Sequence, residues 1–272
     1  MTVSPPLKWH GGKQMLADWI LEQMPEHVHF VEPYAGGLGV LLAKPMGASE
    51  VVNDMHGALS NFWRTLQDPT AFEHLVRRAQ ATPVSHAAWE DAEHVLTGWT
   101  PGDEPDPLAA WAFFVTVRQS RQGLRRSFCT LSRARTRRDM NEQASAWLSA
   151  IDGLSEAHER LKAVVVLNQP ALDVIRQQDG TETWFYLDPP YHPDTRTAKQ
   201  AYEHEMSHED HIELLDTLAN IRGKFTLSGY PCELYEQAAD ICGWRSVMKD
   251  VPNHASGAKV KAHRIETLWM NY

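Results

Sequence analysis

The stretch Trp184–Tyr191, WFYLDPPY, constrains the fold of this chain more than any other. Its first four residues are apolar or aromatic without alternation, which is typical of a strand buried on both faces of a sheet. Pro189 and Pro190 lack the backbone N–H that a strand ladder needs, so we expect the strand to end at Asp188. Open α/β sheets bind ligands at the carboxyl edge of their strands, and this exit would place the Asp188 carboxylate and the Tyr191 ring there.

These groups suit recognition of an amino group on a flat ring. The Asp188 carboxylate and a neighbouring backbone carbonyl are both acceptors, so together they can hold a planar amine that offers two N–H donors. Tyr191 provides a ring on which a base can stack. The plainer alternative is a buried strand that ends in a proline turn, with Asp188 merely solvated. The candidate catalytic residues are Asp188, Pro189, Pro190 and Tyr191.

Composition narrows the class of protein. A chain of 272 residues with 43% hydrophobic residues suits one large α/β domain or a domain with a sizeable insertion. No apolar run is long enough to span a bilayer, and the N-terminus lacks the apolar core of a signal peptide, so we expect a cytoplasmic protein without a membrane partner. We expect free thiols in a reducing compartment, because no metal spacing links Cys129, Cys232 and Cys242.

The histidines and the net charge argue against two simple classes. The 14 histidines are scattered, and no metal is expected. His208 and His211 could share one helix face, where solvated polar positions are the preferred interpretation. The formal charge of −9 argues against a wholly electrostatic nucleic-acid binder, but it does not exclude basic residues gathered in one place.

Two glycine-rich segments near the N-terminus indicate a ligand site. Leu7–Lys13, LKWHGGK, places lysines and Trp9 around a Gly-Gly turn, and a helix is predicted over residues 14–24. The alternative is a glycine turn before a surface helix. In His29–Leu42 a strand ends near Val31, Glu32-Pro33-Tyr34 leaves it, and a turn at residues 36–39 precedes a helix. This turn is neither a dinucleotide fingerprint nor a P-loop, which favours a ligand with a ribose but no phosphate.

A second strand is predicted over Glu50–Asp54, EVVND. Asp54 follows the glycine turn by about 20 residues, where dinucleotide-binding folds place the carboxylate that binds ribose hydroxyls. The alternative is that Asn53 or Asp54 caps the helix predicted over Ala58–Leu66.

The middle of the chain is predicted to be helical and contains a basic segment. Helices are expected within Phe62–Gly98, with a Ser85 cap, and from Leu108 to Val117. Acidic residues are absent from residues 118–138, and arginine forks can contact phosphates or read guanine edges. The alternative is a solvated basic loop. The eight candidate DNA-binding arginines are Arg118, Arg121, Arg125, Arg126, Arg133, Arg135, Arg137 and Arg138.

The C-terminal half returns to alternating strands and helices. Asn141–Ala163 predicts helix and Val164–Leu167 a buried strand, after which Asp173 is a candidate for the base or cofactor pocket or a plain cap. Pro193–Tyr202 is either a loop that closes over substrate or a connection. Further elements are predicted, namely a helix over Ser207–Ile221 with Asp210 in a capping box, and strands over Lys224–Tyr230 and His263–Tyr272.

Four features follow one another along the chain: KWHGGK, VEPYAGG, an acid after the second strand, and DPPY. In this order they resemble the motifs of the DNA adenine methyltransferases that use S-adenosylmethionine and carry the methionine-site segment at the N-terminus. DPPY is also used by enzymes that methylate the cytosine 4-amino group, whereas K-W-x-G-G-K in front is similar to the adenine branch. The Arg118–Arg138 segment does not match the recognition hairpin of enzymes that methylate GATC. By this resemblance Trp9, Lys13, Asp54 and Asp188 match cofactor-contacting positions. The candidate cofactor-binding residues also include Glu32, Tyr34, Gly36 and Asp173. Tyr34 stands where phenylalanine is usual in this family, and Leu38 interrupts the alternating glycines.

The resemblance implies a Rossmann-like methyltransferase α/β fold with helices on both faces of the sheet and an inserted, mostly helical DNA-recognition domain. The expected catalytic domain is residues 1–60 and 160–272, and the expected target-recognition insertion is residues 61–159. It implies methyl transfer from S-adenosylmethionine to the 6-amino group of adenine in a specific double-stranded DNA sequence, by base flipping. A cognate restriction endonuclease is a possible partner. Alternatives are methylation of the cytosine 4-amino group or of adenine in structured RNA, or a non-catalytic nucleic-acid-binding protein.

Overall fold

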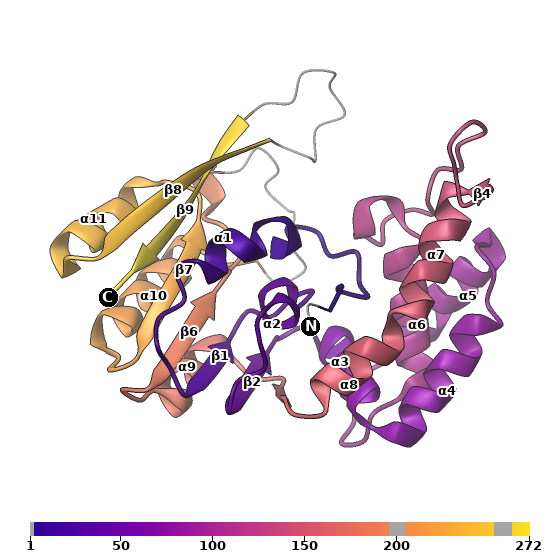
Figure 1. Cartoon of the computed structure of the whole chain (residues 1–272), viewed down its shortest axis with the longest axis horizontal. Coiled ribbons are helices and arrows are strands. Elements are labelled where there is room, and N and C mark those ends of the chain that lie inside the picture. Colours follow the sequence, from indigo (N-terminus) through magenta and orange to yellow (C-terminus); the bar gives the residue numbers. More distant parts are fainter. Residues whose placement is uncertain (1–2, 196–204, 253–262) are drawn as a thin grey trace. The chain divides into compact units, whose positions relative to one another are not determined.

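The computed structural model describes residues 3–195, 205–252 and 263–272 (Figure 1). Its main sheet has seven strands in the order β5-β2-β1-β6-β7-β9-β8. β1 pairs in parallel with β2 and β6, and β6 pairs in parallel with β7, whereas β9 runs antiparallel to β7 and β8. The strands are β1 (His29–Glu32), β2 (Ser49–Asn53), β5 (Val165–Leu167), β6 (Thr183–Leu187), β7 (Lys224–Gly229), β8 (Arg245–Pro252) and β9 (His263–Met270).

Helices flank this mostly parallel sheet, which is the arrangement of a Rossmann-like methyltransferase fold and confirms the predicted fold class. The α-helices are α1 (Ala17–Leu21), α2 (Gly39–Ala43), α3 (Gly57–Gln67), α4 (Pro69–Gln80), α5 (His86–Leu96), α6 (Pro107–Arg118), α7 (Glu142–Asp152), α8 (Leu154–Leu161), α9 (Ala171–Gln178), α10 (His208–Asn220) and α11 (Glu233–Cys242). Short 3-10 helices cover Lys13–Leu16, Arg121–Gly123 and Pro193–Thr195.

β6 is the strand that the WFYL run predicts. All five of its residues are buried, because it lies between two parallel neighbours and both of its faces are covered. In register, Trp184 lies beside Phe30 of β1 on one side and beside Lys224 of β7 on the other. The strand ends at Leu187, so Asp188 is the first residue beyond it, as expected.

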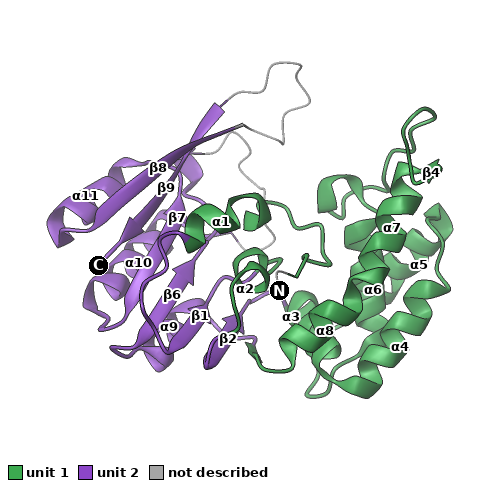
Figure 2. Ribbon diagram, in the orientation of Figure 1, with its two compact units in different colours: residues 1–21, 36–46, 57–166 green, residues 22–35, 47–56, 167–272 purple. Residues whose placement is uncertain are grey.

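Two compact units divide the chain, one of residues 1–21, 36–46 and 57–166, and the other of residues 22–35, 47–56 and 167–272 (Figure 2). We call them unit 1 and unit 2. Unit 2 contains β1, β2, β6, β7, β8 and β9 with helices α9, α10 and α11, and unit 1 contains helices α1 to α8. The division into catalytic and target-recognition domains concerns function, and it stays a prediction.

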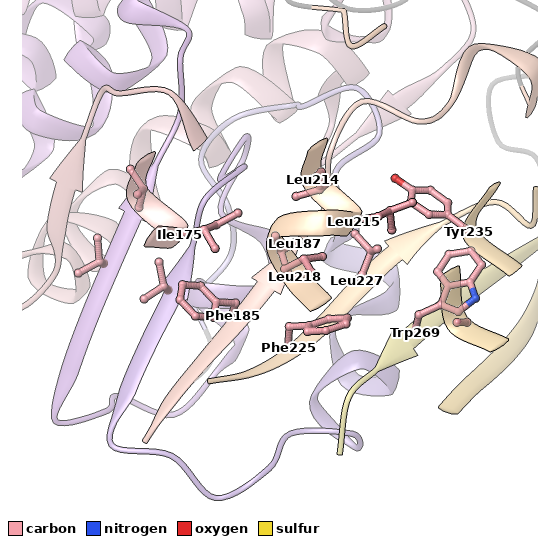
Figure 3. Close-up of a cluster of buried hydrophobic side chains, with 14 residues drawn as sticks. Ile175, Phe185, Leu187, Leu214, Leu215, Leu218, Phe225, Leu227, Tyr235 and Trp269 are labelled. Carbon is pink, nitrogen blue, oxygen red and sulfur yellow. The ribbon is translucent and has the colours of Figure 1, made fainter. Parts of the chain in front are cut away.

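The core of unit 2 lies between one face of the sheet and helices α9, α10 and α11 (Figure 3). Leu214, Leu215 and Leu218 recur at helical spacing on α10, and they pack against Phe225 and Leu227 of β7. Full burial of one such side chain stabilises the fold by roughly 1.5–3 kcal/mol. The predicted capping box at the start of α10 is confirmed by the Ser207 and Asp210 side chains.

Unit 1 is built around α6. Every residue from Ala109 to Val117 is buried, so this helix is apolar on all sides rather than amphipathic. Phe114 stacks on Phe62 of α3 with ring centroids 5.6 Å apart. The predicted Ser85 cap of α5 is confirmed, since its hydroxyl accepts from the Ala88 N–H.

Several local predictions were wrong in extent or environment. The helix predicted over residues 14–24 is a 3-10 turn followed by α1, which ends at Leu21. Gly153 divides the helix predicted over Asn141–Ala163 into α7 and α8. The strand predicted to be buried is β5, an edge strand in which Val165 is 54% exposed. Residues 196–202 of the Pro193–Tyr202 loop lie outside the described residues.

Candidate active site

Three of the predicted site carboxylates follow the carboxyl ends of three neighbouring strands of unit 2. Glu32 is the last residue of β1, Asp54 follows β2, and Asp188 follows β6. These strands are adjacent in the order β2-β1-β6 and are parallel, so their carboxyl ends meet at one edge of the sheet. This is the edge at which open α/β sheets bind ligands.

The surroundings of Asp188 are rich in buried phenols. Tyr186 on β6 and Tyr191 beyond the prolines are both buried. Burial raises the pKa of each hydroxyl well above its usual value, and the charges of Asp188 and Glu266 raise it further. Both phenols therefore keep their protons at neutral pH.

Tyr191 is held more firmly than the sequence suggests. Its side chain is only 6% exposed, and its ring meets the Tyr230 ring in a T-shaped contact with centroids 4.6 Å apart. Its hydroxyl donates to Oε1 of Glu266 on β9. Sequence reasoning missed Glu266, although it stands inside the closing strand that was predicted.

His192 begins a second set of contacts that sequence reasoning also missed. Its Nε2 lies 2.9 Å from Nδ1 of His208, and its ring centroid lies 5.1 Å from that of His211. The Nδ1 atom of His211 lies 2.9 Å from the Tyr235 hydroxyl. The solvated position predicted for His211 was wrong, because the side chain is fully buried against α11, whereas His208 is exposed.

Asp54 takes part in a turn after β2. Its Oδ1 accepts from the His56 N–H at 2.9 Å, and its backbone carbonyl accepts from Nδ2 of Asn168 at 2.6 Å. The neighbouring Asn53 side chain donates to the Pro33 carbonyl at 3.0 Å. These bonds hold the ends of β1, β2 and β5 in place and present Asp54 at the edge of the sheet.

Tyr34 and Asp173, the two other predicted site residues of unit 2, lie among side chains of the same unit. Tyr34 packs against the hydrophobic cluster beneath α10, and burial, with the charges of Asp210 and Glu213, raises the pKa of its hydroxyl. Asp173 lies in the first turn of α9, is half exposed and pairs with Arg176 at 3.7 Å. It is not the N-cap of α9, which is Pro170.

In unit 1 the N-terminal loop, Leu7–Lys13, packs on the glycine turn, residues 36–39. A Cβ on Gly36 would lie 2.6 Å from Nε1 of Trp9, and a Cβ on Gly37 would lie 2.6 Å from Cβ of Trp9. A Cβ on Gly39 would lie 2.8 Å from the backbone nitrogen of Gln14. These glycines are therefore needed for the close approach of the loop itself.

The loop and the glycine turn are further tied together by hydrogen bonds. Lys13 is buried and its Nζ donates to the Gly11 carbonyl at 3.2 Å. The Gly36 carbonyl accepts from Nε1 of Trp63 on α3 at 3.2 Å. Leu38, which interrupts the glycines, is fully buried and adopts a left-handed conformation (φ 57°) just before α2.

Comparison with protein families matches residues 9–94 and 130–257 to the D12 class N6 adenine-specific DNA methyltransferases. The chain belongs to this family. The matched ranges include Trp9–Lys13 of the N-terminal loop, the glycine turn, Asp54 and the DPPY segment, so the resemblance seen in the sequence is confirmed.

Two relatives have related names. The methyltransferase is 26% identical over 235 residues to the Type II methyltransferase M1.LlaDCHI of Lactococcus lactis subsp. cremoris, an alignment that covers 82% of this chain and 79% of the relative. It is 35% identical over 60 residues to the DNA N-6-adenine-methyltransferase of Escherichia phage P1. That second match is local, since it covers 22% of this chain and 8% of the phage protein.

In the methyltransferase, the arginine-rich segment, residues 118–138, ends in a hairpin that the sequence did not predict. β3 (Thr136–Arg137) pairs antiparallel with β4 (Met140–Asn141), and both turn residues, Arg138 and Asp139, have positive φ angles. Such a turn has the twist of a two-residue hairpin, although glycine or asparagine usually occupies it. Among the described residues, four of the five non-glycine residues with positive φ lie within 122–139.

The eight arginines do not all face solvent. Arg118 donates to the Ala146 carbonyl at 2.8 Å, and burial lowers its pKa to about 10. Arg138 donates to the Ser145 carbonyl at 2.8 Å although the residue is largely exposed. Arg125 lies over the Phe113 ring at 5.2 Å. The other five, at positions 121, 126, 133, 135 and 137, are exposed.

The arginine-rich segment also contacts the N-terminal loop within unit 1. Gly123 has a φ of +75°, and a Cβ there would lie 1.9 Å from the Lys8 carbonyl oxygen. Burial, with the charge of Arg118, lowers the pKa of Lys8. Burial, with the charge of Arg126, lowers the pKa of His10. The segment proposed to bind DNA and the loop expected to bind cofactor are thus in direct contact.

Membrane spans and metal clusters are both absent from the described residues. None of the helices there is both long and apolar enough to cross a membrane. Within the same residues, no group of three or more histidine, cysteine, aspartate or glutamate side chains is arranged to hold a metal ion. Cys129, Cys232 and Cys242 are free thiols, as expected.

Proposed function

We propose that the methyltransferase transfers the methyl group of S-adenosylmethionine to the 6-amino group of an adenine flipped out of a specific double-stranded DNA sequence. The observation that carries this proposal is the position of Asp188. It lies at the carboxyl edge of the central parallel strands, directly before two prolines that make its exit from the sheet rigid. Membership of the D12 class family supports the adenine in DNA as substrate.

The residues present fit the cofactor. When bound, S-adenosylmethionine supplies a methyl group on a positively charged sulfur. Carboxylates at the ends of β1 and β2 are the acceptors that ribose hydroxyls need, and we assign Glu32 and Asp54 to this task. We further assign Trp9 and Lys13 of the N-terminal loop and Gly36 of the glycine turn to cofactor binding. Tyr34 and Asp173 are assigned more indirect roles, since Tyr34 is influenced by Asp210 and Glu213 of α10 and Asp173 pairs with Arg176 of α9.

Asp188 would activate the amine. The lone pair of an adenine amino group is delocalised into the ring, which makes it a poor nucleophile. Hydrogen bonds accepted by the Asp188 carboxylate and the Pro189 carbonyl favour a pyramidal nitrogen, on which the lone pair is localised. These bonds strengthen as the nitrogen becomes positive, so they stabilise the transition state more than the bound substrate. Alignment of nitrogen and methyl carbon can supply on the order of 7–11 kcal/mol more.

The adenine must leave the duplex to reach Asp188. Its amino group is paired inside the helix, and extrusion costs a few kcal/mol. Tyr191 follows Asp188 directly after two rigid prolines, so we assign its ring as the aromatic surface for the extruded base. Pro190 restricts the backbone between the two groups and keeps their separation constant.

DNA would be held by the arginine-rich segment of the target-recognition insertion, residues 61–159. We assign the five exposed arginines to contacts with phosphates or base edges, and one of them, Arg135, pairs with Glu142 at 3.6 Å in the structure. Arg118 and Arg138 also support the segment through their bonds to the α7 backbone. Because the chain as a whole carries a net charge of −9, DNA contact should concentrate on this local excess of positive charge.

The proposal is tested by replacing Asp188 with asparagine. We expect Asp188→Asn to lose at least about 100-fold in kcat, because the amide accepts more weakly than a carboxylate and cannot stabilise a positive nitrogen. Affinity for duplex DNA, measured by gel shift, should stay within about threefold of wild type. The control is Asp216→Asn, which removes one exposed carboxylate of α10.

Transfer is followed with tritiated S-adenosylmethionine, and the product nucleosides are identified by mass spectrometry. N6-methyladenine from DNA supports the proposal. N4-methylcytosine, or transfer to structured RNA in preference to DNA, would replace it with one of the alternatives. Full activity of Asp188→Asn would show that the amine is activated elsewhere.

A further inference from the structure

Glu266 is a buried carboxylate outside the proposed catalytic residues. It lies on β9 and is 3% exposed, and its charge, like that of Asp188, raises the pKa of the Tyr191 hydroxyl. Burying a carboxylate is costly unless hydrogen bonds compensate it. Its placement in a closing strand therefore requires a reason beyond packing.

The hydrogen bonds of Glu266 supply that reason. Its Oε1 accepts from the Tyr191 hydroxyl and from Oγ of Ser228, the latter at 2.7 Å. Ser228 belongs to β7, which pairs directly with β9, so the carboxylate is fixed to the sheet on one side. Tyr191 lies on the exit from β6, so the same oxygen ties that exit to the sheet on the other side.

The bond to Tyr191 restricts the ring at its far end. Pro189 and Pro190 restrict the backbone that leads into Tyr191, and the Tyr191 hydroxyl is held by Glu266. A ring anchored at both ends has little freedom to tilt. Because burial and nearby carboxylates raise its pKa well above the usual value, the phenol stays protonated at neutral pH and keeps donating.

We infer that Glu266 is a positioning residue that orients the Tyr191 ring for the extruded adenine. The inference rests on the proposed function. Glu266 itself would not touch substrate or cofactor; it acts through the Tyr191 hydroxyl. Misplacement of a reacting group by about 1 Å can cost a factor of about 100 in rate, so loss of the anchor should appear in kcat.

The experiment compares four single variants and one double variant of the full chain. Glu266→Leu removes the acceptor at similar volume, Glu266→Gln keeps one acceptor oxygen, and Tyr191→Phe removes the donor but keeps the ring. The control is Glu50→Gln, which changes another buried carboxylate of the same sheet, one whose Oε1 accepts from the Gly47 N–H at 3.0 Å. Wild type is assayed in the same series, and far-UV circular dichroism checks folding.

The kinetic outcome separates positioning from general packing. We expect Glu266→Leu and Tyr191→Phe each to lower kcat by about 10- to 100-fold with KM for S-adenosylmethionine within about threefold of wild type. Glu266→Gln should recover most of the lost rate. Adding Glu266→Leu to Tyr191→Phe should cause no further loss, because the two side chains act through one bond.

A second measurement does not depend on activity. In protein labelled with ¹³C at the tyrosine Cζ atom, the resonance missing from Tyr191→Phe identifies Tyr191. Glu266→Leu should shift this resonance and Glu50→Gln should not. An unmoved resonance would overturn the anchor, and a shifted resonance with wild-type kcat would overturn its role. If wild type itself transfers no methyl group, the proposed function falls and this inference falls with it.

Discussion

Gly123 offers a direct test of the contact between the arginine-rich segment and the N-terminal loop. Its φ of +75° is unfavourable for any residue with a Cβ, and a Cβ there would lie 1.9 Å from the Lys8 carbonyl oxygen. Gly98 provides the matched control, because its φ is +74° but a Cβ would meet nothing within 4 Å. Both glycines belong to unit 1.

The two positions separate backbone strain from steric overlap. Alanine at either position costs about 1–2 kcal/mol for the left-handed conformation. At Gly123 the backbone carbonyl of Lys8 must also move, which adds about 1–3 kcal/mol of overpacking. We therefore expect Gly123→Ala to destabilise the protein by about 2–5 kcal/mol and Gly98→Ala by about 1–2 kcal/mol.

Urea unfolding followed by tryptophan fluorescence measures both values by linear extrapolation. Isothermal titration with S-adenosylmethionine adds a functional readout, since displacement of Lys8 should disturb Trp9 and weaken cofactor binding in Gly123→Ala alone. Equal destabilisation of the two variants would refute the reasoning, because it would mean that Gly123 makes no close contact with the loop in solution.

Two further predictions concern DNA binding and helix capping. Arg137→Ala should weaken duplex binding and reduce the slope of log K against log salt by about one, whereas Arg118→Ala should chiefly lower the free energy of unfolding, because Arg118 is bound to the α7 backbone. A salt titration by fluorescence anisotropy distinguishes them, and identical salt slopes for wild type and Arg137→Ala would count against phosphate contact there. Ser207→Ala breaks the capping box with Asp210 and should cost about 0.5–2 kcal/mol in urea unfolding; an unchanged midpoint would show that the cap contributes nothing.

The parts of the fold that follow from local pattern could be predicted from the sequence. The unbroken apolar run before Asp188 predicted a central strand, and the prolines predicted where it ends. Acids placed after strands predicted Glu32 and Asp54 at one edge, because parallel strands present their carboxyl ends together. The Ser207 cap could be predicted from the residues that directly follow it.

The rest depends on contacts between distant residues. Glu266 and Tyr191 meet because β9 inserts antiparallel beside β7, a pairing that no local pattern specifies. His211 looks polar in sequence, but the packing of α11 on α10 buries it. Leu38 adopts a left-handed conformation without being glycine, since its burial outweighs a strain of about 1–2 kcal/mol.

One consequence of the strand order concerns how this architecture can diversify. The chain departs from the sheet after Asn53 and returns at Val165, on the adjacent strand. The two ends of this inserted segment are thus fixed on neighbouring strands of the sheet. Doubling the length of the segment would cost only about 0.6 kcal/mol in closure entropy. The interval between the two family-matched ranges, residues 95–129, falls inside it. We therefore expect whole helices of this inserted segment to be exchangeable, while the strands that position Glu32 and Asp188 keep their register.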